Sequence, residues 1–436
     1  MVDTWQSRLA HRLPFYYGWM VFGAAVGVAY SARPLMAVAT LSIFVVPMTQ
    51  EFGWSRGLFS GAVSAGGLVA VAISPLAGRV IDRYGGGVVV ASASAISGIC
   101  AVGLSLISQP WAFYGLYVPA RAVFAGPLEL GTSTAVSNWF IRRRSLALAL
   151  LLVGQGTGLA LMPLVAQLLI GGWGWRAAWA SLGIFTLSVG ILPPVLLMVR
   201  RPEDIGLEAD PVPEHKPSIQ GKLASTTGNR PAGAATEPNL TVGEALHTRA
   251  FWVLTLFSIA GFVVQAGVSL HQVPHLIQQG VGGPAAAFSA SVFALSQTVG
   301  GVIWATLARR VPLRLLLSLT GLTAAAGALG IGATSSLPGG VLWALALGTG
   351  VGGLHMLLRL IYADYYGRRN LGSIRGLTIG AQIGGQVIGP VTAGFMFDLT
   401  GGYQLPFRAF AIALSLAAVL VLAATPPRKA LEEPFK

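Results

Sequence analysis

Charged side chains are scarce in this 436-residue sequence, where Asp, Glu, Lys and Arg together make up 10%. Soluble domains carry about 25% charged residues. With 54% hydrophobic residues and a mean hydropathy of +0.69, the chain cannot cover itself with a hydrated surface. We therefore expect an all-α membrane protein, because helices satisfy their own backbone hydrogen bonds inside the lipid bilayer.

Cysteine is almost absent as well, because Cys100 is the one cysteine and lies in an apolar run. A disulfide and a cysteine metal site are therefore excluded. The sequence holds no Gly-x-x-x-x-Gly-Lys-Ser/Thr loop and no nucleophile–base motif, so this chain hydrolyses no ATP. GTGVGG at 348–353 matches Gly-x-Gly-x-x-Gly, but it lies in an apolar helix with no preceding strand, which indicates close helix packing. We expect neither an enzyme nor a bound cofactor or metal.

Long apolar runs are abundant, and twelve of them reach the length of about 20 residues that a bilayer-spanning helix needs. The predicted spans are 17–47, 56–78, 86–108, 111–139, 145–170, 175–199, 250–278, 284–308, 313–334, 338–364, 373–398 and 403–424. The N-terminal residues lack the short apolar core and cleavage site of a signal peptide. The stretch 200–249 is rich in Pro, Gly, Ser, Thr and charge, which predicts a cytoplasmic linker with a short surface helix at its end.

Basic residues are distributed unevenly between the two sides of the predicted bundle. With the N-terminus inside, 22 of the 28 Lys and Arg residues lie in cytoplasmic segments, three lie outside and three lie within spans. Such a bias predicts that both termini are cytoplasmic in a multi-pass protein of the cell (inner) membrane. It also accounts for the net charge of +13 without a nucleic-acid partner.

The two halves of the chain resemble each other weakly. Motifs of the first half recur 226 or 227 positions later: Val46-Pro47 as Val273-Pro274, Gly158 and Pro163 as Gly385 and Pro390, and WFIRR (139–143) as YYGRR (365–369). A constant offset indicates an internal duplication. We therefore predict a six-helix bundle over 1–199, a linker over 200–249 and a second six-helix bundle over 250–436.

The loop after the second span, GRVIDRYGG at 78–86, resembles the signature loop of the major facilitator superfamily. The matching residues are Gly78, Asp82, Arg83 and Gly85. The resemblance implies two pseudo-symmetric six-helix bundles and an aspartate that latches the cytoplasmic side shut. Gly78 would permit close helix contact, Asp82 would cap a neighbouring helix, and Arg83 would reach headgroups or a carboxylate. The corresponding ARRVP at 308–312 lacks the aspartate, so we expect a one-sided latch.

Further motifs look like the monocarboxylate-transporter and oxalate:formate-antiporter branch of that superfamily. They are FYYGWMVFGAAV, NWFIRRRSLALAL, RRPEDIGL, DYYGRRNLGSIRGL and GPVTAGFMFDLTGGY. The branch implies a secondary active or facilitative transporter that moves small organic anions, above all monocarboxylates, by alternating access. We expect a monomer whose partners are the anion, the lipid bilayer and, in one alternative, protons.

Arg33 lies near the middle of the first span, in VAYSARPLMAV. A charge at the bilayer centre costs at least about 2.5 kcal/mol, which marks it as a functional candidate. Pro34 removes a backbone donor and predicts a bend beside this cation. In the monocarboxylate-transporter family a basic residue near this point contacts the substrate carboxylate, and Arg33 matches by position. The alternative is a structural arginine that pairs with backbone carbonyls.

Three further candidates are Arg121, Arg359 and Glu129. Arg121 resembles an arginine found widely in the superfamily, which leaves substrate binding and a shared scaffold role equally open. Glu129 must be protonated, paired or hydrated in lipid. The repeat places it opposite His355, so the two form a candidate proton site. Arg359 shares a helical face with His355 and either binds substrate or extends to the cytoplasmic interface.

Neutral polar residues complete the set of candidates. Tyr30, Gln297 and Gln386 are expected to orient the substrate. His271 and His275, near the outer end of the seventh span, are expected to be half-exposed interface residues, with a gate or proton-entry role for His271 as the alternative. Two histidines alone indicate no metal site.

The sequence also departs from the family. The eighth span has no ionisable residue in its interior, where monocarboxylate transporters carry an Asp–Arg pair. The eleventh span lacks the lysine of the oxalate:formate antiporters. Proton symport through Glu129, exchange and facilitated diffusion therefore stay open. The alternative function is efflux of drugs or lipophilic cations, for which the single acidic residue inside the spans is thin support.

Overall fold

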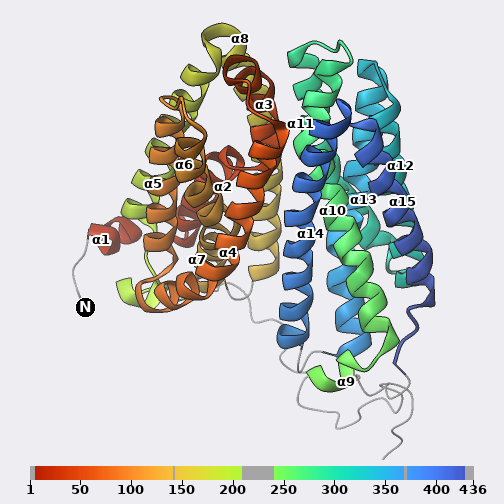
Figure 1. Ribbon diagram of the computed structural model, residues 1–436. Coiled ribbons are helices and arrows are strands. Elements are labelled where there is room, and N and C mark those ends of the chain that lie inside the picture. The colour runs from red at the N-terminus through yellow and green to blue at the C-terminus, as the bar shows by residue number, and fades with distance from the viewer. Residues whose placement is uncertain (1–4, 141–142, 209–239, 368–370, 428–436) are drawn as a thin grey trace, which may run out of the picture.

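The computed structural model describes residues 5–140, 143–208, 240–367 and 371–427 (Figure 1). Within these ranges the side chains at 33, 34, 82, 144, 145, 149 and 371–373 are left out of the description. Every regular element in the described ranges is a helix. The expectation of an all-α protein is confirmed.

The first half of the chain forms one group of helices. They are α1 (Trp5–Arg12), α2 (Gly18–Leu35), α3 (Val38–Phe52), α4 (Arg56–Tyr84), α5 (Gly86–Leu104), α6 (Pro110–Val123), the π-helical η1 (Phe124–Leu128), α7 (Glu129–Trp139), α8 (Arg144–Leu197) and the 3-10 helix η2 (Pro202–Ile205). Helix α8 holds two predicted spans, because Gly174 breaks it with a φ of 82°. A left-handed residue cannot continue an α-helix.

The second half forms a matching group, seen beside the first in Figure 1. Its helices are α9 (Val242–Leu246), α10 (Arg249–Gln278), α11 (Gly283–Leu307), α12 (Leu313–Ala333), α13 (Leu337–Tyr366), α14 (Leu371–Thr400), α15 (Gln404–Leu420) and the 3-10 helix η4 (Val421–Ala423). Helix α9 confirms the short helix expected before the seventh span. In the described part of the chain, eight helices are apolar and long enough to span a membrane. Each of the twelve predicted spans has helical counterparts.

Two predicted spans are interrupted. The first was expected to run unbroken from 17 to 47 with a bend near Pro34, but α2 ends at Leu35 and α3 continues from Val38 to Phe52. Ala37, between them, is extended with φ −68° and ψ 147°. The fourth span contains η1, because Pro127 in its middle provides no backbone donor.

Glycines with positive φ reveal the repeat more sharply than the sequence motifs do. Gly53 (φ 67°) ends α3 and Gly280 (φ 88°) follows α10, while Gly174 (φ 82°) divides α8 and Gly401 (φ 72°) follows α14. Both pairs are 227 positions apart. Because glycine adopts this conformation without steric cost, the same turn is built in the same way in each half. The two bundles are pseudo-symmetric.

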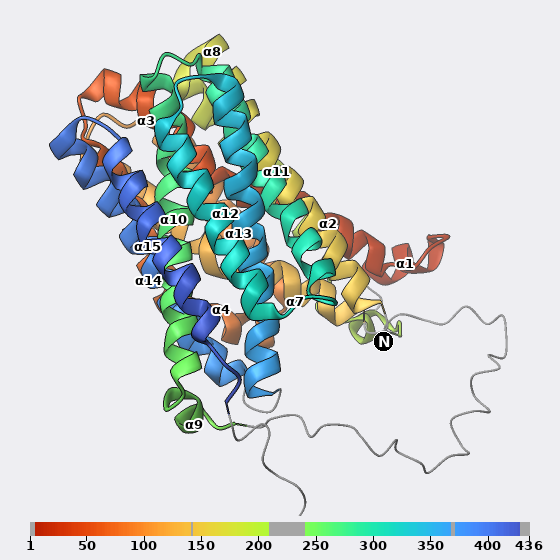
Figure 2. The ribbon, with the colours of Figure 1, turned by 90° about the vertical axis from the view of Figure 1, so that its right-hand side faces the viewer.

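The two ends of the molecule differ. We call the end with the C-terminus of α3 and the N-terminus of α4 the upper end, and the end with α9 the lower end, as Figures 1 and 2 draw them. One hydrophobic core lies wholly between Leu240 and Ala424, and two others lie before residue 208. A fourth joins the halves through Leu270, Val273 and Leu276 of α10. The bundle boundaries at 199/200 and 249/250 remain a prediction.

Candidate functional site

The break between α2 and α3 is held from α6. Arg121 is buried, and its Nη1 donates a hydrogen bond of 2.9 Å to the carbonyl oxygen of Met36. Its guanidinium also lies over the Phe124 ring, 4.5 Å from the centroid. Met36 lies outside both helices, so a side chain has to satisfy its carbonyl. Arg33 is two residues from the end of α2, beside this break, and its side chain lies outside the described part of the structure.

A π-helical turn separates Arg121 from Glu129. The turn η1 ends at Leu128, so Glu129 is the first residue of α7, where it is half-buried. In a straight α-helix these two residues would lie about 12 Å apart along the axis. A π-turn has wider winding and shifts the residues that follow it around the helix axis. Such turns are common at functional sites, which makes the neighbourhood of Glu129 the irregular part of the fourth span.

His355 is paired within its own half. Its Nε2 lies 2.8 Å from Oε1 of Gln265 on α10, and its ring is 4.9 Å from that of Phe262. No direct hydrogen bond joins Glu129 and His355 in the described structure, so their pairing remains a prediction. Arg359 is exposed, one turn further along α13.

Both histidines of α10 are buried, so the expectation of half-exposed interface residues is wrong. His271 and Gln272 are 0% exposed and His275 is 1% exposed. The Nε2 of His271 lies 3.1 Å from Ser60 Oγ on α4 and 3.3 Å from the Pro390 carbonyl on α14. Packing of α14 and α15 over this end of α10 covers them, which the spacing along one helix could not reveal.

Three predicted substrate residues are half-buried and unpartnered. The side chains of Tyr30 on α2, Gln297 on α11 and Gln386 on α14 make no hydrogen bond with any described residue. Buried polar groups need partners, and these groups are free to take water or a ligand. Gln297 and Gln386 lie on α11 and α14, which contact α8 and α4 of the other half, whereas Tyr30 lies on α2, which packs within its own half.

Helices α4 and α14 meet along a stripe that occupies only the upper part of the molecule. Ser64 Oγ donates to the Val387 carbonyl at 2.6 Å, and a Cβ on Gly67 would lie 3.6 Å from Val387 Cγ2. Continuing down the same face of α14, a Cβ at Gly384, Gly380 or Gly376 would meet nothing within 4 Å. The two halves are therefore in contact at the upper end and apart below Val387.

Helices α8 and α11 are the second pair that joins the halves, and they too separate toward the lower end. A Cβ on Gly283 of α11 would lie 2.7 Å from Gln167 Nε2 of α8, and one on Gly156 would lie 3.0 Å from Thr298 Cγ2. One turn below Thr298, Val302 is 63% exposed. Both helix pairs thus separate on the lower side of the molecule.

The segment 78–86 lies at the lower end, and the loop expected there is reduced to Gly85, because α4 runs to Tyr84 and α5 begins at Gly86. Gly85 has a φ of 91°, and a Cβ on it would lie 2.9 Å from Arg200 Cβ. Arg83 is exposed and lies over the Tyr84 ring. Gly78 would meet nothing within 4 Å, so the close helix contact expected there is absent from this conformation, in which the halves are apart. The side chain of Asp82 lies outside the description, and the latch remains a prediction.

Several motifs behind the family resemblance meet in one structural cluster, which the sequence did not reveal. Trp139 Nε1 donates to the Val199 carbonyl at 2.9 Å, Tyr17 donates to Leu197 at 3.0 Å, and Tyr16 donates to Trp139 at 2.9 Å. The second half repeats the arrangement, since Tyr365 donates to the Ala424 carbonyl at 2.7 Å. These residues tie the end of each bundle together and are structural.

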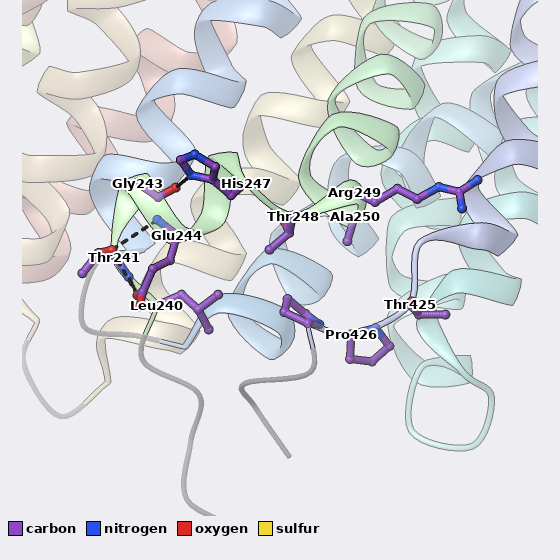
Figure 3. Close-up of a pocket in the computed structure, with 11 residues that line it drawn as sticks. Leu240, Thr241, Gly243, Glu244, His247, Thr248, Arg249, Ala250, Thr425 and Pro426 are labelled. Carbon is purple, nitrogen blue, oxygen red and sulfur yellow. Dashed lines mark hydrogen bonds between the residues drawn. The ribbon is translucent and has the colours of Figure 1, made fainter. Parts of the chain in front are cut away.

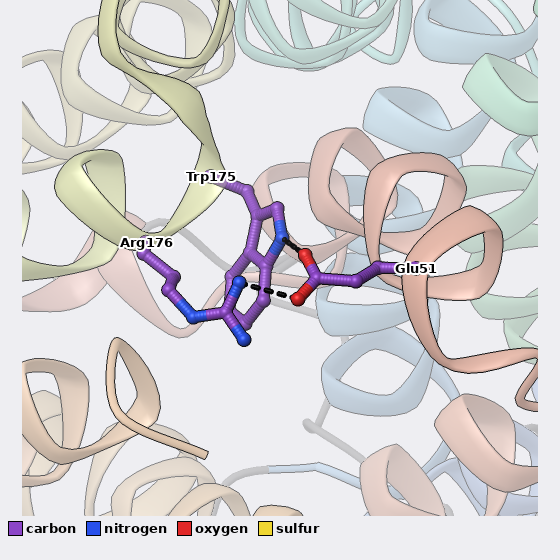
Figure 4. A network of polar contacts seen from close by, with 3 residues as sticks. All are labelled: Glu51, Trp175 and Arg176. Carbon is purple, nitrogen blue, oxygen red and sulfur yellow. Dashed lines mark hydrogen bonds and ion pairs between the residues drawn. The ribbon is translucent and has the colours of Figure 1, made fainter. Parts of the chain in front are cut away.

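An ion pair at the upper end was also missed by the sequence analysis. Glu51 at the end of α3 accepts hydrogen bonds from Trp175 Nε1 at 2.7 Å and from Arg176 Nη1 at 2.5 Å (Figure 4). These two donors hold the pKa of the Glu51 carboxyl below its ordinary value. The cluster fixes α3 against α8 inside the first half.

A pocket at the lower end lies between α9 and the residues after α15 (Figure 3). Its volume is about 740 Å³, and its lining includes Glu244, His247, Arg249 and Pro426. Thr241 and Glu244 cap each other there, and His247 Nδ1 lies 2.7 Å from the Gly243 carbonyl. None of the predicted substrate residues lines this pocket.

Comparison with known proteins agrees with the fold. The family model described as Major Facilitator Superfamily matches residues 26–381 and 274–436. Monocarboxylate transporter 11 of Homo sapiens is 26% identical over 415 residues, covering 90% of this chain and 79% of the relative. Probable anion transporter 4, chloroplastic, of Arabidopsis thaliana is 28% identical over 391 residues, covering 84% and 69%.

Solved structures share the architecture at low sequence identity. The nucleoside transporter NupG superposes with a TM-score of 0.72 at 12% identity, covering 93% of this chain and 99% of that one. A bacterial homologue of the human lysosomal transporter Spinster, in an inward-facing and occupied conformation, gives a TM-score of 0.66 at 15% identity, covering 94% and 98%.

Proposed function

The chain belongs to the major facilitator superfamily, and on that premise we propose that this transporter moves small organic anions, of the monocarboxylate class, by alternating access. The observation that carries the proposal is Arg33, two residues before the break that ends α2. Broken helices near the midplane commonly form substrate sites in secondary transporters. The relatives named monocarboxylate and anion transporters support the same substrate class at low identity.

Arg33 would bind the carboxylate. An arginine offers two parallel donors to a carboxylate and stays charged, so it serves as a fixed anion anchor rather than a proton carrier. In the interior of the predicted spans, away from their ends, the charged residues are three arginines and one glutamate, and this balance favours an anion. Tyr30, Gln297 and Gln386, unpartnered in the described structure, would orient the remainder of the substrate. Arg121 and Arg359 stand as further candidates, with Arg121 also supporting the break.

Proton coupling is proposed through Glu129 as one of three modes, beside exchange and facilitated diffusion. Glu129 follows the π-turn, which places a titratable group at an irregular helix segment. His355 and His271 are the other candidates. His271 contacts Ser60 of the first half and the Pro390 carbonyl of its own half, so a proton arriving there would act on the contact between the halves at Ser60.

The proposal includes a topology. The positive-inside bias of the sequence places both termini in the cytoplasm, which makes the lower end cytoplasmic and the described conformation open to the inside. The loop containing Asp82 would then latch this side in the opposite state. The cell (inner) membrane, a monomeric state and bundle boundaries at 199/200 and 249/250 belong to the same proposal.

A substrate panel tests the proposed class. The purified protein is reconstituted in liposomes, and uptake of labelled monocarboxylates, dicarboxylates and lipophilic cations is measured with and without a pH gradient. We expect saturable uptake of monocarboxylates. Transport of lipophilic cations with no uptake of any carboxylate would contradict the proposal and favour an efflux antiporter.

A further inference from the structure

A carboxylate of the second half caps a helix of the first half. Asp398, two residues before the end of α14, accepts hydrogen bonds from the backbone N–H groups of Arg56 at 3.0 Å and Gly57 at 2.9 Å. These are the first two residues of α4. The first N–H groups of a helix have no partner within it. The ordinary N-cap, Ser55, accepts only from Leu58, at 3.2 Å.

The cap depends on glycine at two positions. A Cβ on Gly57 would lie 2.8 Å from Asp398 Oδ2, and a Cβ on Gly394, one turn earlier in α14, would lie 2.5 Å from Ser60 Oγ. Both distances are too short for real contacts. Without side chains at these positions, the end of α14 approaches close enough for the carboxylate to reach the first turn of α4.

The cap lies at the far end of the α4–α14 stripe. From Val387, where the two helices part, to Asp398 is about 16 Å along α14. A rotation that brings the lower ends together and opens the upper end would move Asp398 furthest from α4. Asp398 is exposed, so both it and the released N–H groups would gain water, which makes the bond reversible rather than permanent.

The pseudo-symmetric helix pair has no equivalent cap. The position 227 residues before Asp398 is Gly171 on α8, where even an added Cβ would meet nothing within 4 Å. Gly283, the counterpart of Arg56, faces Gln167 instead. In the described structure the cap is therefore specific to the α4–α14 pair and is not a feature of both pseudo-symmetric pairs.

Asp82 occupies the mirrored position on the partner helix. It lies two residues before the end of α4, as Asp398 lies two residues before the end of α14. At the upper end, Asp398 near the C-terminus of α14 lies at the N-terminus of α4. At the lower end, Asp82 near the C-terminus of α4 is at the same end of the molecule as the N-terminus of α14. Negative charge at a helix N-terminus is stabilising.

We propose that Asp398 is a positioning residue of the transport cycle, and that its cap on α4 holds the upper end closed while the lower end is open. The cap must break before the upper end opens. The inference rests on the alternating access of the proposed function but not on the substrate.

The test measures the opening of the upper end directly. Spin labels are placed at Ser108 and Ser335, two exposed loop residues of opposite halves that are 227 positions apart, in a variant whose buried Cys100 is replaced by Ala. Double electron–electron resonance in liposomes without substrate gives the distance between them. Asp398→Asn keeps only one of the two acceptor oxygens, and the methyl of Gly57→Ala displaces the carboxylate oxygen that Gly57 contacts. We expect each change to raise the long-distance population relative to the short one about fivefold, because each removes at least one hydrogen bond of the cap.

Matched variants separate gating from misfolding. Asp364→Asn removes an exposed carboxylate elsewhere, and Gly115→Ala adds a methyl where nothing lies within 4 Å. Both should keep the parent distribution, and Asp398→Glu should restore part of the short distance. An unchanged distribution in both Asp398→Asn and Gly57→Ala overturns the inference. If the distance distribution shifts in a protein that transports no carboxylate, the proposed substrate is refuted and the proposed role of the Asp398 cap stands.

Discussion

Arg121 of the fourth span and Met36 of the first are joined by a hydrogen bond of 2.9 Å from the guanidinium to the main-chain carbonyl. This bond occurs where α2 has ended and α3 has yet to begin. It connects Arg121 to the break that follows the helix carrying Arg33. The scaffold and substrate-binding interpretations of Arg121 are therefore compatible, because the residue that supports the break also shapes the proposed site.

Arg121→Gln is expected to destabilise the first bundle. A hydrogen bond from a charged donor contributes about 1.5–3 kcal/mol, and the shorter side chain leaves the Met36 carbonyl without this donor. Thermal unfolding in detergent should show a lower Tm. Arg408→Gln, at an exposed position on α15, is the control and should unfold like the parent. Equal Tm values for both variants would show that the break holds without Arg121.

Gly85→Ala is expected to lower stability, whereas Gly78→Ala is not. Gly85 has a φ of 91°, and its new methyl would lie 2.9 Å from Arg200 Cβ. A residue with a side chain pays about 1–2 kcal/mol in the left-handed region alone. Gly78 is helical and faces open space in this conformation. Melting curves of the two variants test this contrast, and a lower Tm for Gly78→Ala would mean that a neighbour packs on it.

The Glu51 cluster predicts a pH dependence at the upper end. Hydrogen bonds from Trp175 and Arg176 lower the pKa of Glu51 in the folded protein. A lowered folded-state pKa makes the stabilisation complete above the unfolded pKa of about 4.3, and it is lost as the pH falls through the folded-state value. The Tm difference between the parent and Glu51→Gln should be small at pH 7, because the pair is exposed, and should shrink further as the pH falls below the unfolded pKa. A difference that grows at low pH would have the wrong sign.

The Glu129→Gln variant tests whether Glu129 carries the proton that is coupled to anion uptake. If Glu129 carries the proton, the amide cannot titrate, so stimulation of uptake by a pH gradient should disappear. Exchange of internal for external anion needs no net proton movement and should persist. Both activities are measured in the same liposomes. Gradient stimulation that survives in Glu129→Gln would remove Glu129 from the coupling proposal and leave exchange or facilitated diffusion.

Much of the fold follows from the sequence because the bilayer imposes simple rules. Apolar length located the spans, Pro34 indicated a bend where the structure has a complete break, and the 227-residue offset indicated the duplication. The contacts between residues far apart in the sequence could not be predicted in this way. Asp398 and Glu51 appear in the sequence as ordinary polar residues at helix ends, and their partners are far away along the chain.

The burial of the two histidines of α10 could not be predicted from the sequence either. Their spacing of four residues correctly places them on one face of a helix, but nothing in α10 itself reveals that Tyr403 and Phe407 of the last helix cover that face. The centroid of the His275 ring lies 6.0 Å from that of Tyr403 and 5.8 Å from that of Phe407. Burial depended on residues more than a hundred positions away.

The central claim is that Arg33 binds the substrate carboxylate, and its most direct test is the initial rate of monocarboxylate uptake in liposomes for Arg33→Gln, Arg33→Lys and the control Arg408→Gln. The account predicts that uptake falls at least about tenfold in Arg33→Gln, because a charge-assisted bond of about 1.5–3 kcal/mol is lost. It predicts partial uptake in Arg33→Lys, which keeps the charge, and parental uptake in Arg408→Gln. Parental uptake in Arg33→Gln, with unchanged KM, would contradict it.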